Sequence, residues 1–200
     1  MAQPFWKVQS SVQTAEGTAV QRYFPLRAGY VWTYAERVVT ASQTVLLQRR
    51  VTLTVHSRHE NEYVAHWDFQ SGRTHLPNVR YRVVEDGVQQ AQLAGDTAYT
   101  PFAYLLKAPL VMGTTWRTVD GHDVRITALG FSYTVPAGTF GACVETLQEA
   151  EPTPQSRMLT QYYFAPDIGL VWQQRRLFQQ ELLERIDIME LQRLPEPAQL

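Results

Sequence analysis

Cysteine is almost missing from this chain of 200 residues, which has a single thiol at Cys143. One thiol excludes an intramolecular disulfide, a cysteine-ligated zinc ribbon and a CxxC redox pair. Ala142 and Val144 flank Cys143 in a segment that we expect to be a strand, so we predict a buried, unreactive thiol. Any metal site would have to use histidine, aspartate and glutamate.

An excess of charge of one sign is also missing. Eighteen Lys and Arg residues balance nineteen Asp and Glu residues, which gives a net charge of −1. Such a chain has no basic surface for a nucleic acid or an anionic membrane, so we expect neither as a partner. Arginines occur in pairs at Arg49–Arg50, Arg80 with Arg82, and Arg175–Arg176, interleaved with Glu and Gln. We interpret them as solvated strand faces, with an anionic ligand on the sheet as the alternative.

Long apolar runs are absent as well. No stretch approaches the roughly 18 apolar residues that a membrane-spanning helix needs, so we expect no transmembrane segment. The first thirty residues contain neither the apolar core of a signal peptide nor a lipobox cysteine. We therefore predict a cytoplasmic location for the chain as given. A location in the cell envelope would require that a leader has been removed.

The sequence also lacks the short motifs of common enzymes. It contains no HExxH, GxSxG, GxxxxGK[ST] or GxGxxG, and no two carboxylates at a spacing that indicates a glycosidase. We therefore assign no catalytic residue, expect no cofactor, and favour a non-catalytic role over an enzyme.

Alternation of apolar and polar residues dominates the chain, as in Val51-Thr52-Leu53-Thr54-Val55. Strands with one buried face have this period of two, and Gly, Pro and Asp separate the runs as in hairpins. We predict an all-β fold, with one strongly curved antiparallel sheet or open half-barrel of about ten or eleven strands. The expected strands lie near residues 30–40, 45–57, 62–70, 78–85, 88–94, 115–119, 123–135, 139–149, 157–165, 170–178 and 182–193.

The alternating region predicts a single domain over residues 22–194. We expect residues 1–21 to form a partly ordered arm and residues 195–200 a disordered tail. Within the domain, apolar residues at helical spacing predict a short helix near residues 99–107 that lies on the sheet. The segment from Leu182 fits either a helical face or a strand. We favour a strand, because the preceding residues offer it a hairpin partner.

One motif, PLxxGxxW, occurs twice, at residues 25–32 and 109–116, with 84 residues between equivalent positions. In each copy the glycine allows a left-handed backbone at a turn, and the tryptophan then anchors the start of a strand. We interpret the two copies as a recurrent way to start a strand, in preference to a duplicated domain.

Three segments carry a family resemblance: FPLxxGxxWxY at residues 24–34, PAGTFxxC at 136–143 and YYxAPxxGLV at 162–171. In order and spacing, residues 22–194 resemble a group of bacterial domains of unknown function, the DUF3108 or TapB-type group. Many members of that group are predicted to be exported lipoproteins. The resemblance implies a curved antiparallel sheet or open half-barrel of the kind found in lipoprotein carriers, and it implies no known activity.

Aromatic residues make up 12% of the chain and concentrate in the expected central strands. Packing of the core is the first interpretation. The alternative is that some of them line the concave face of an incompletely closed sheet and bind a hydrophobic small molecule or a partner segment. The candidate ligand-binding residues are Trp32, Tyr34, Trp67, Phe69, Phe102 and Tyr163.

Two other functions remain open. His56, His66 and Asp68 could converge on neighbouring strands as ligands of Zn²⁺ or Mn²⁺, which would indicate a metal-dependent hydrolase. Long strands with few lysines at their edges could also pair between chains, which would indicate a structural protein. Our preferred hypothesis is a non-catalytic binding or accessory domain that is a monomer or a homodimer.

Overall fold

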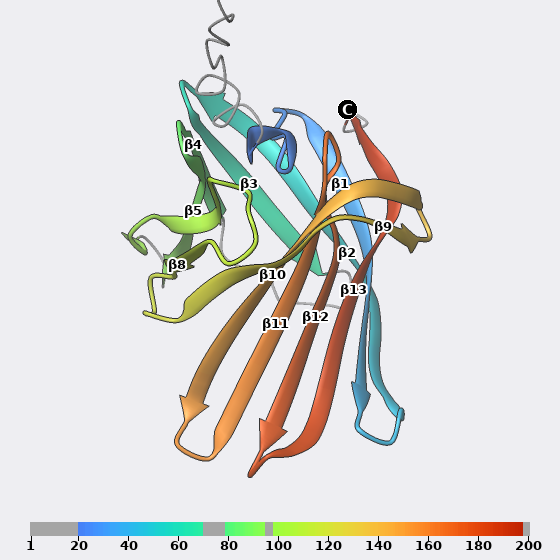
Figure 1. Cartoon of the computed structure of the whole chain (residues 1–200). Coiled ribbons are helices and arrows are strands. Elements are labelled where there is room, and N and C mark those ends of the chain that lie inside the picture. The colour runs from blue at the N-terminus through green and yellow to red at the C-terminus, as the bar shows by residue number, and fades with distance from the viewer. Residues whose placement is uncertain (1–19, 70–78, 95–97, 198–200) are drawn as a thin grey trace, which may run out of the picture.

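One antiparallel sheet makes up the fold (Figure 1). A computed structural model describes residues 20–69, 79–94 and 98–197, and these contain thirteen strands. Their order in the sheet is β6-β5-β4-β3-β2-β1-β13-β12-β11-β10-β9-β8, with β7 also paired to β5. The strands are β1 (Tyr30–Thr40), β2 (Val45–His59), β3 (Glu62–Phe69), β4 (Val79–Val84), β5 (Gly87–Ala94), β6 (Ala98–Tyr99), β7 (Ala103–Lys107), β8 (Thr115–Arg117), β9 (Asp123–Val135), β10 (Gly138–Thr153), β11 (Ser156–Ala165), β12 (Gly169–Gln179) and β13 (Leu182–Pro197).

The sheet is strongly curved and does not close into a barrel, which confirms the predicted fold class. Eleven of the strands, β1–β5 and β8–β13, overlap the expected ones. Within the described residues no backbone ladder joins the two ends of the sheet, one formed by β6 and β7 and the other by β8. A side chain bridges them instead, because the Trp116 indole Nε1–H donates to the Tyr104 carbonyl at 3.0 Å.

The predicted helix near residues 99–107 is wrong. This segment contains β6, which pairs with β5 at Tyr99, and β7, which pairs with β5 from Ala103 to Lys107. A few apolar residues at helical spacing cannot decide between helix and strand. The edge of β5 decides here, because its N–H and C=O groups need partners that an extended segment supplies. In the strand, Leu106 is fully buried.

The segment from Leu182 is a strand, which confirms the favoured alternative. β13 lies between β1 and β12 and runs to Pro197, so it includes the first three residues of the expected tail. At the other end of the chain, residues 20–22 form a helical turn in which Val20 is fully buried. The remainder of the expected arm and the last three residues lie outside the described residues.

Alternation places many of the large apolar side chains on the concave face of the sheet. Along β1 these include Trp32 and Tyr34, both of which are buried. Phe24, from the segment before β1, lies over the same face. Its ring centroid is 5.1 Å from that of Tyr81 and 6.2 Å from that of Phe164. The N-terminal segment thereby connects the β4 side of the curved sheet to the β11 side.

Both copies of PLxxGxxW make the same turn. Gly29 and Gly113 have φ angles of 81° and 84°, in the left-handed region that favours glycine. Gly29 N–H donates to the Val55 carbonyl at 2.7 Å, and Gly113 N–H to the Ile126 carbonyl at 3.0 Å. The tryptophan three residues later is buried in each copy. The geometry of the strand start therefore recurs.

We predict that Gly29→Ala and Gly113→Ala each destabilise the protein by about 1 kcal/mol. No atom lies within 4 Å of the Cβ that either substitution adds, so the cost comes from the backbone conformation alone. The measurement is urea unfolding followed by tryptophan fluorescence.

Gly141→Ala is the matched control. The φ angle of Gly141 lies outside the left-handed region, and a Cβ there meets Ser132 Oγ only at 3.8 Å. This substitution should change the free energy of unfolding by less than about 0.5 kcal/mol. Equal losses in all three variants would contradict the importance of the left-handed turns.

Candidate functional site

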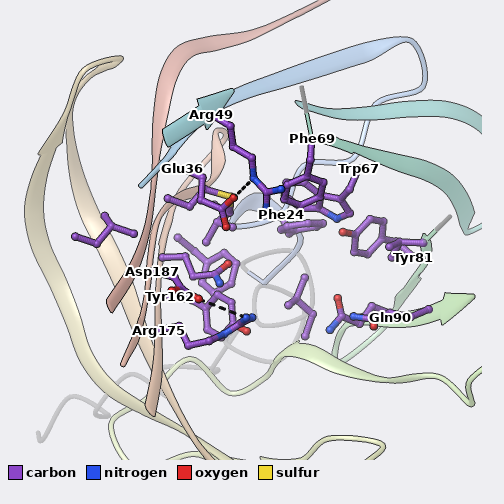
Figure 2. Close-up of a pocket in the computed structure, with 18 residues that line it drawn as sticks. Phe24, Glu36, Arg49, Trp67, Phe69, Tyr81, Gln90, Tyr162, Arg175 and Asp187 are labelled. Carbon is purple, nitrogen blue, oxygen red and sulfur yellow. Dashed lines mark hydrogen bonds and ion pairs between the residues drawn. The ribbon is translucent and has the colours of Figure 1, made fainter. Parts of the chain in front are cut away.

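A cavity of about 420 Å³ opens on the concave face of the sheet (Figure 2). One side of it is formed by residues from β1–β5 and β7, and the other by residues from β11–β13. Phe24 of the N-terminal segment lines it as well. The cavity is therefore bounded by both halves of the same curved sheet.

One wall of the cavity is aromatic. Trp67 and Phe69 of β3 and Tyr81 of β4 lie on it, as Figure 2 shows. The Trp67 ring is held from behind by Tyr34, at a ring-centroid distance of 5.7 Å. Aromatic side chains fixed by their neighbours give a preformed apolar surface of the kind that binds small molecules.

An ion pair lies next to this wall. Glu36 of β1 accepts a hydrogen bond from Arg49 of β2, and only 16% and 18% of their side chains are exposed. The Arg49 guanidinium carbon also lies 4.1 Å from the centroid of the Phe69 ring, a cation–π contact. Arg49 is therefore engaged by both a carboxylate and an aromatic ring.

A second group of charged residues at the cavity wall pairs one carboxylate with two arginines. Asp187 of β13 has Arg185 Nε at 2.9 Å, whereas its contact with Arg175 Nη1 is 3.9 Å long. The Nε atom of Arg175 is buried and has no hydrogen-bond partner among the described residues. The cavity therefore contains one arginine, Arg175, whose charge is compensated only in part.

Two of the six predicted ligand-binding residues, Trp67 and Phe69, line this cavity. Trp32 and Tyr34 lie on the same face but are used in packing. The Trp32 indole donates to the backbone carbonyl of residue 168 at 2.8 Å, and the Tyr34 hydroxyl donates to that of residue 170 at 3.1 Å. These two side chains hold the sheet together beside the cavity.

Phe102 and Tyr163 lie away from the cavity, which corrects their expected place on its wall. The Phe102 ring has the Arg82 guanidinium carbon 3.9 Å from its centroid, and Arg82 alternates with the inward-facing Tyr81. Tyr163 follows the cavity residue Tyr162 and so lies on the opposite face, 4.4 Å from the Trp172 ring centroid. A pattern of two consecutive aromatic residues cannot indicate which of them faces inward.

The charged residues of the cavity were not among the predicted site residues. The paired arginines nevertheless contain a signal for them. Consecutive residues of a strand lie on opposite faces, so one member of Arg49–Arg50 and one of Arg175–Arg176 must lie on the buried side. The interpretation of both arginines in each pair as solvated is therefore wrong for the member that lies on the buried side.

The histidine cluster forms no metal centre in the part of the chain that the structure describes. The rings of His56 and His66 are 6.2 Å apart between centroids. No group of three His, Cys, Asp or Glu side chains among the described residues could hold a metal ion, so Asp68 does not complete a site there. A register shift in β2 between Val55 and Ser57, at the position of His56, interrupts the regular pairing on which the hypothesis relied.

Cys143 is buried, as predicted. Burial raises the pKa of its thiol, and the thiol donates to the Phe140 carbonyl at an Sγ–O distance of 3.3 Å. Both effects disfavour the reactive thiolate.

We predict that the protein loses stability when the pH rises above 10.0. Burial raises the pKa of Tyr34 and of Tyr81 above the ordinary value of 10.0, and a hydrogen bond with Trp67 offsets part of the effect at Tyr81. A group with a raised pKa in the folded state contributes its full stabilisation below the unfolded value and loses it above that value. Urea unfolding at a series of pH values measures this dependence.

Tyr81→Phe isolates one of these groups. The variant should show a shallower fall of the free energy of unfolding above pH 10.0 than the parent, because one buried hydroxyl no longer ionises on unfolding. An identical fall in parent and variant would contradict this assignment.

Within the described residues, no helix has the length and apolar content that a membrane crossing requires.

No protein-family model matches the chain, and no curated protein is significantly similar to it in sequence. Among solved structures, the chain is similar to a proposed exported protein with a YmcC-like fold from Bacteroides fragilis, with a TM-score of 0.52 and 16% identity over 86% of this chain and 97% of that chain. A proposed lipoprotein from Parabacteroides distasonis matches with a TM-score of 0.46 at the same identity and coverage. The first of these similarities shows that the chain shares the fold of the Bacteroides fragilis protein.

Proposed function

We propose that this protein is a non-catalytic binding domain that holds an apolar small molecule in the cavity on its concave face. The cavity is the observation that carries this proposal. Its volume of about 420 Å³ falls within the roughly 300–1,000 Å³ that is usual for small-molecule sites. The space between the two halves of the sheet is therefore large enough to hold a small molecule.

The lining of the cavity supports an apolar ligand. Trp67, Phe69 and Tyr81 present adjacent aromatic surfaces, and Leu105 and Phe164 add apolar surface from other strands. Burial against such walls contributes about 25 cal/mol for each Å² of apolar ligand surface removed from water. A protein segment is the alternative occupant. Because walls from both halves of the sheet bound the cavity, we favour a small molecule.

The edges of the sheet give less support to a structural protein that pairs with itself. Among the described strands, those at the two ends are short: β6 has two residues, β8 has three and β7 has five. Short edge strands are one of the features by which β proteins avoid pairing between chains. We therefore propose that the cavity, and not a sheet edge, is the functional surface.

We also propose that the protein belongs to the DUF3108 or TapB-type group and acts in the cell envelope. The three motifs at residues 24–34, 136–143 and 162–171 support membership of that group. The shared fold with a Bacteroides fragilis protein that is itself a proposed exported protein supports the location.

Binding of the neutral dye N-phenylnaphthylamine, which fluoresces in apolar surroundings, tests the binding function. We predict saturable binding by the parent protein. Gln173→Phe adds a ring to the cavity, where Gln173 lies on the wall, and should weaken dye binding roughly tenfold. Gln174→Phe places the same ring on the opposite face of β12 and should leave binding unchanged.

Thermal melting followed by circular dichroism verifies that both variants are folded. Dye binding that does not saturate, or an equal loss of binding in both folded variants, would overturn the proposed function.

A further inference from the structure

The charges at the cavity indicate which apolar molecules it accepts, and this inference rests on the binding function proposed above. Glu36 and Arg49 compensate each other in one ion pair. Asp187 is shared between Arg175 and Arg185. In these contacts three guanidinium groups therefore meet two carboxylates, which leaves one positive charge in excess. Arg49 and Arg175 line the cavity, and Arg185 lies outside its lining.

The excess charge resides at Arg175. Arg185 lies 2.9 Å from Asp187 in an ion pair, and its Nη2 donates to Asp187 Oδ2 at 3.3 Å. Arg175 approaches Asp187 only to 3.9 Å, which is beyond hydrogen-bond distance. The Arg175 side chain lines the cavity and remains 39% exposed. Its Nε atom is buried without a hydrogen-bond partner among the described residues, as are those of Arg176 and Arg185. The exposed part of the Arg175 side chain is therefore available to a hydrogen-bond acceptor that enters the cavity.

The position of Arg175 relative to the aromatic wall suits a molecule with two different ends. Figure 2 shows the Arg175 guanidinium directed into the space that Tyr81 borders from the other side. A ligand in the cavity therefore meets Arg175 at one end and Trp67 and Phe69 along its remainder. This arrangement separates a charged head from an apolar tail.

We propose that the ligand is a single-chain apolar carboxylate, of the fatty-acid class, whose carboxylate binds Arg175. A carboxylate carries the one negative charge that matches the excess, and its two oxygens fit the paired N–H groups of a guanidinium. A doubly charged phosphate would exceed that charge and would be repelled by Glu36 and Asp187. A cationic head would add to the positive charge that is already in excess.

Displacement of N-phenylnaphthylamine by decanoate, decanol, decylamine and decyl phosphate tests the head group, because the four share one chain. We predict that decanoate displaces the dye at a roughly tenfold lower concentration than decanol, a difference of about 1.4 kcal/mol. Decylamine and decyl phosphate should both be weaker than decanoate. Added salt should reduce the advantage of decanoate over decanol, because it screens the charge of Arg175.

Substitutions on adjacent residues of β12 assign the effect to one side chain. Arg175→Gln should weaken decanoate roughly tenfold and leave decanol within about twofold. Arg175→Lys keeps the charge and should keep part of the preference for decanoate. The matched control is Arg176→Gln, since Arg176 lies on the opposite face and donates to Gln161 at 3.0 Å. It should change neither affinity.

The results distinguish this inference from the function on which it rests. Binding of the dye and decanol with no preference for decanoate, or a tighter fit of decylamine or decyl phosphate, would overturn the carboxylate and leave the binding function intact. An equal loss of decanoate affinity in Arg175→Gln and Arg176→Gln would overturn the assignment to Arg175. Failure of the dye and of all four decyl compounds to bind would overturn the proposed function, and this inference with it.

Discussion

Two hydrogen bonds across the concave face hold the curvature of this sheet. Trp32 donates to the Ile168 carbonyl and Tyr34 to the Leu170 carbonyl, so β1 is tied to the start of β12 although β13 lies between them. In a flat sheet, strands two positions apart are separated by roughly 10 Å, so each side chain reaches across β13 and limits how far β1 and the start of β12 can move apart. Removing either donor would leave a backbone carbonyl without its side-chain hydrogen bond. The two hydrogen bonds therefore favour this particular curvature of the sheet.

The cavity follows from that curvature. Bending brings β3 and β4 opposite β11–β13, and the packed core around Trp32 and Tyr34 gives way to open space beside Trp67 and Phe69. Ion pairs such as Glu36 with Arg49 gain little in a closed core, because removing two charges from water costs more than their attraction returns. The Glu36–Arg49 pair lies at the open part of the concave face, where Arg49 also contacts the Phe69 ring. One face of one sheet thus provides both stability and a site.

Much of the fold was predictable, and much of the site was not. Alternation depends only on which face is buried, so it located eleven strands and the open sheet. It could not locate β6 and β7, whose conformation is set by the edge of β5 and not by their own pattern. The aromatic residues were visible in the sequence. The Trp32 indole, however, donates a hydrogen bond to a carbonyl 136 residues away, and no local pattern reveals that contact. Arg175 was recognisable only as one member of a pair whose inward side the sequence leaves open.

The central claim is that the concave face, besides forming the core, binds an apolar carboxylate. A crystal structure of the protein with a decanoate that carries bromine at the end of its chain tests this claim most directly. The account predicts anomalous bromine density beside Trp67 and Phe69, with the carboxylate within hydrogen-bond distance of the Arg175 guanidinium. Bromine density outside the cavity, or two halves of the sheet packed together with no space between Trp67 and Arg175, would contradict it.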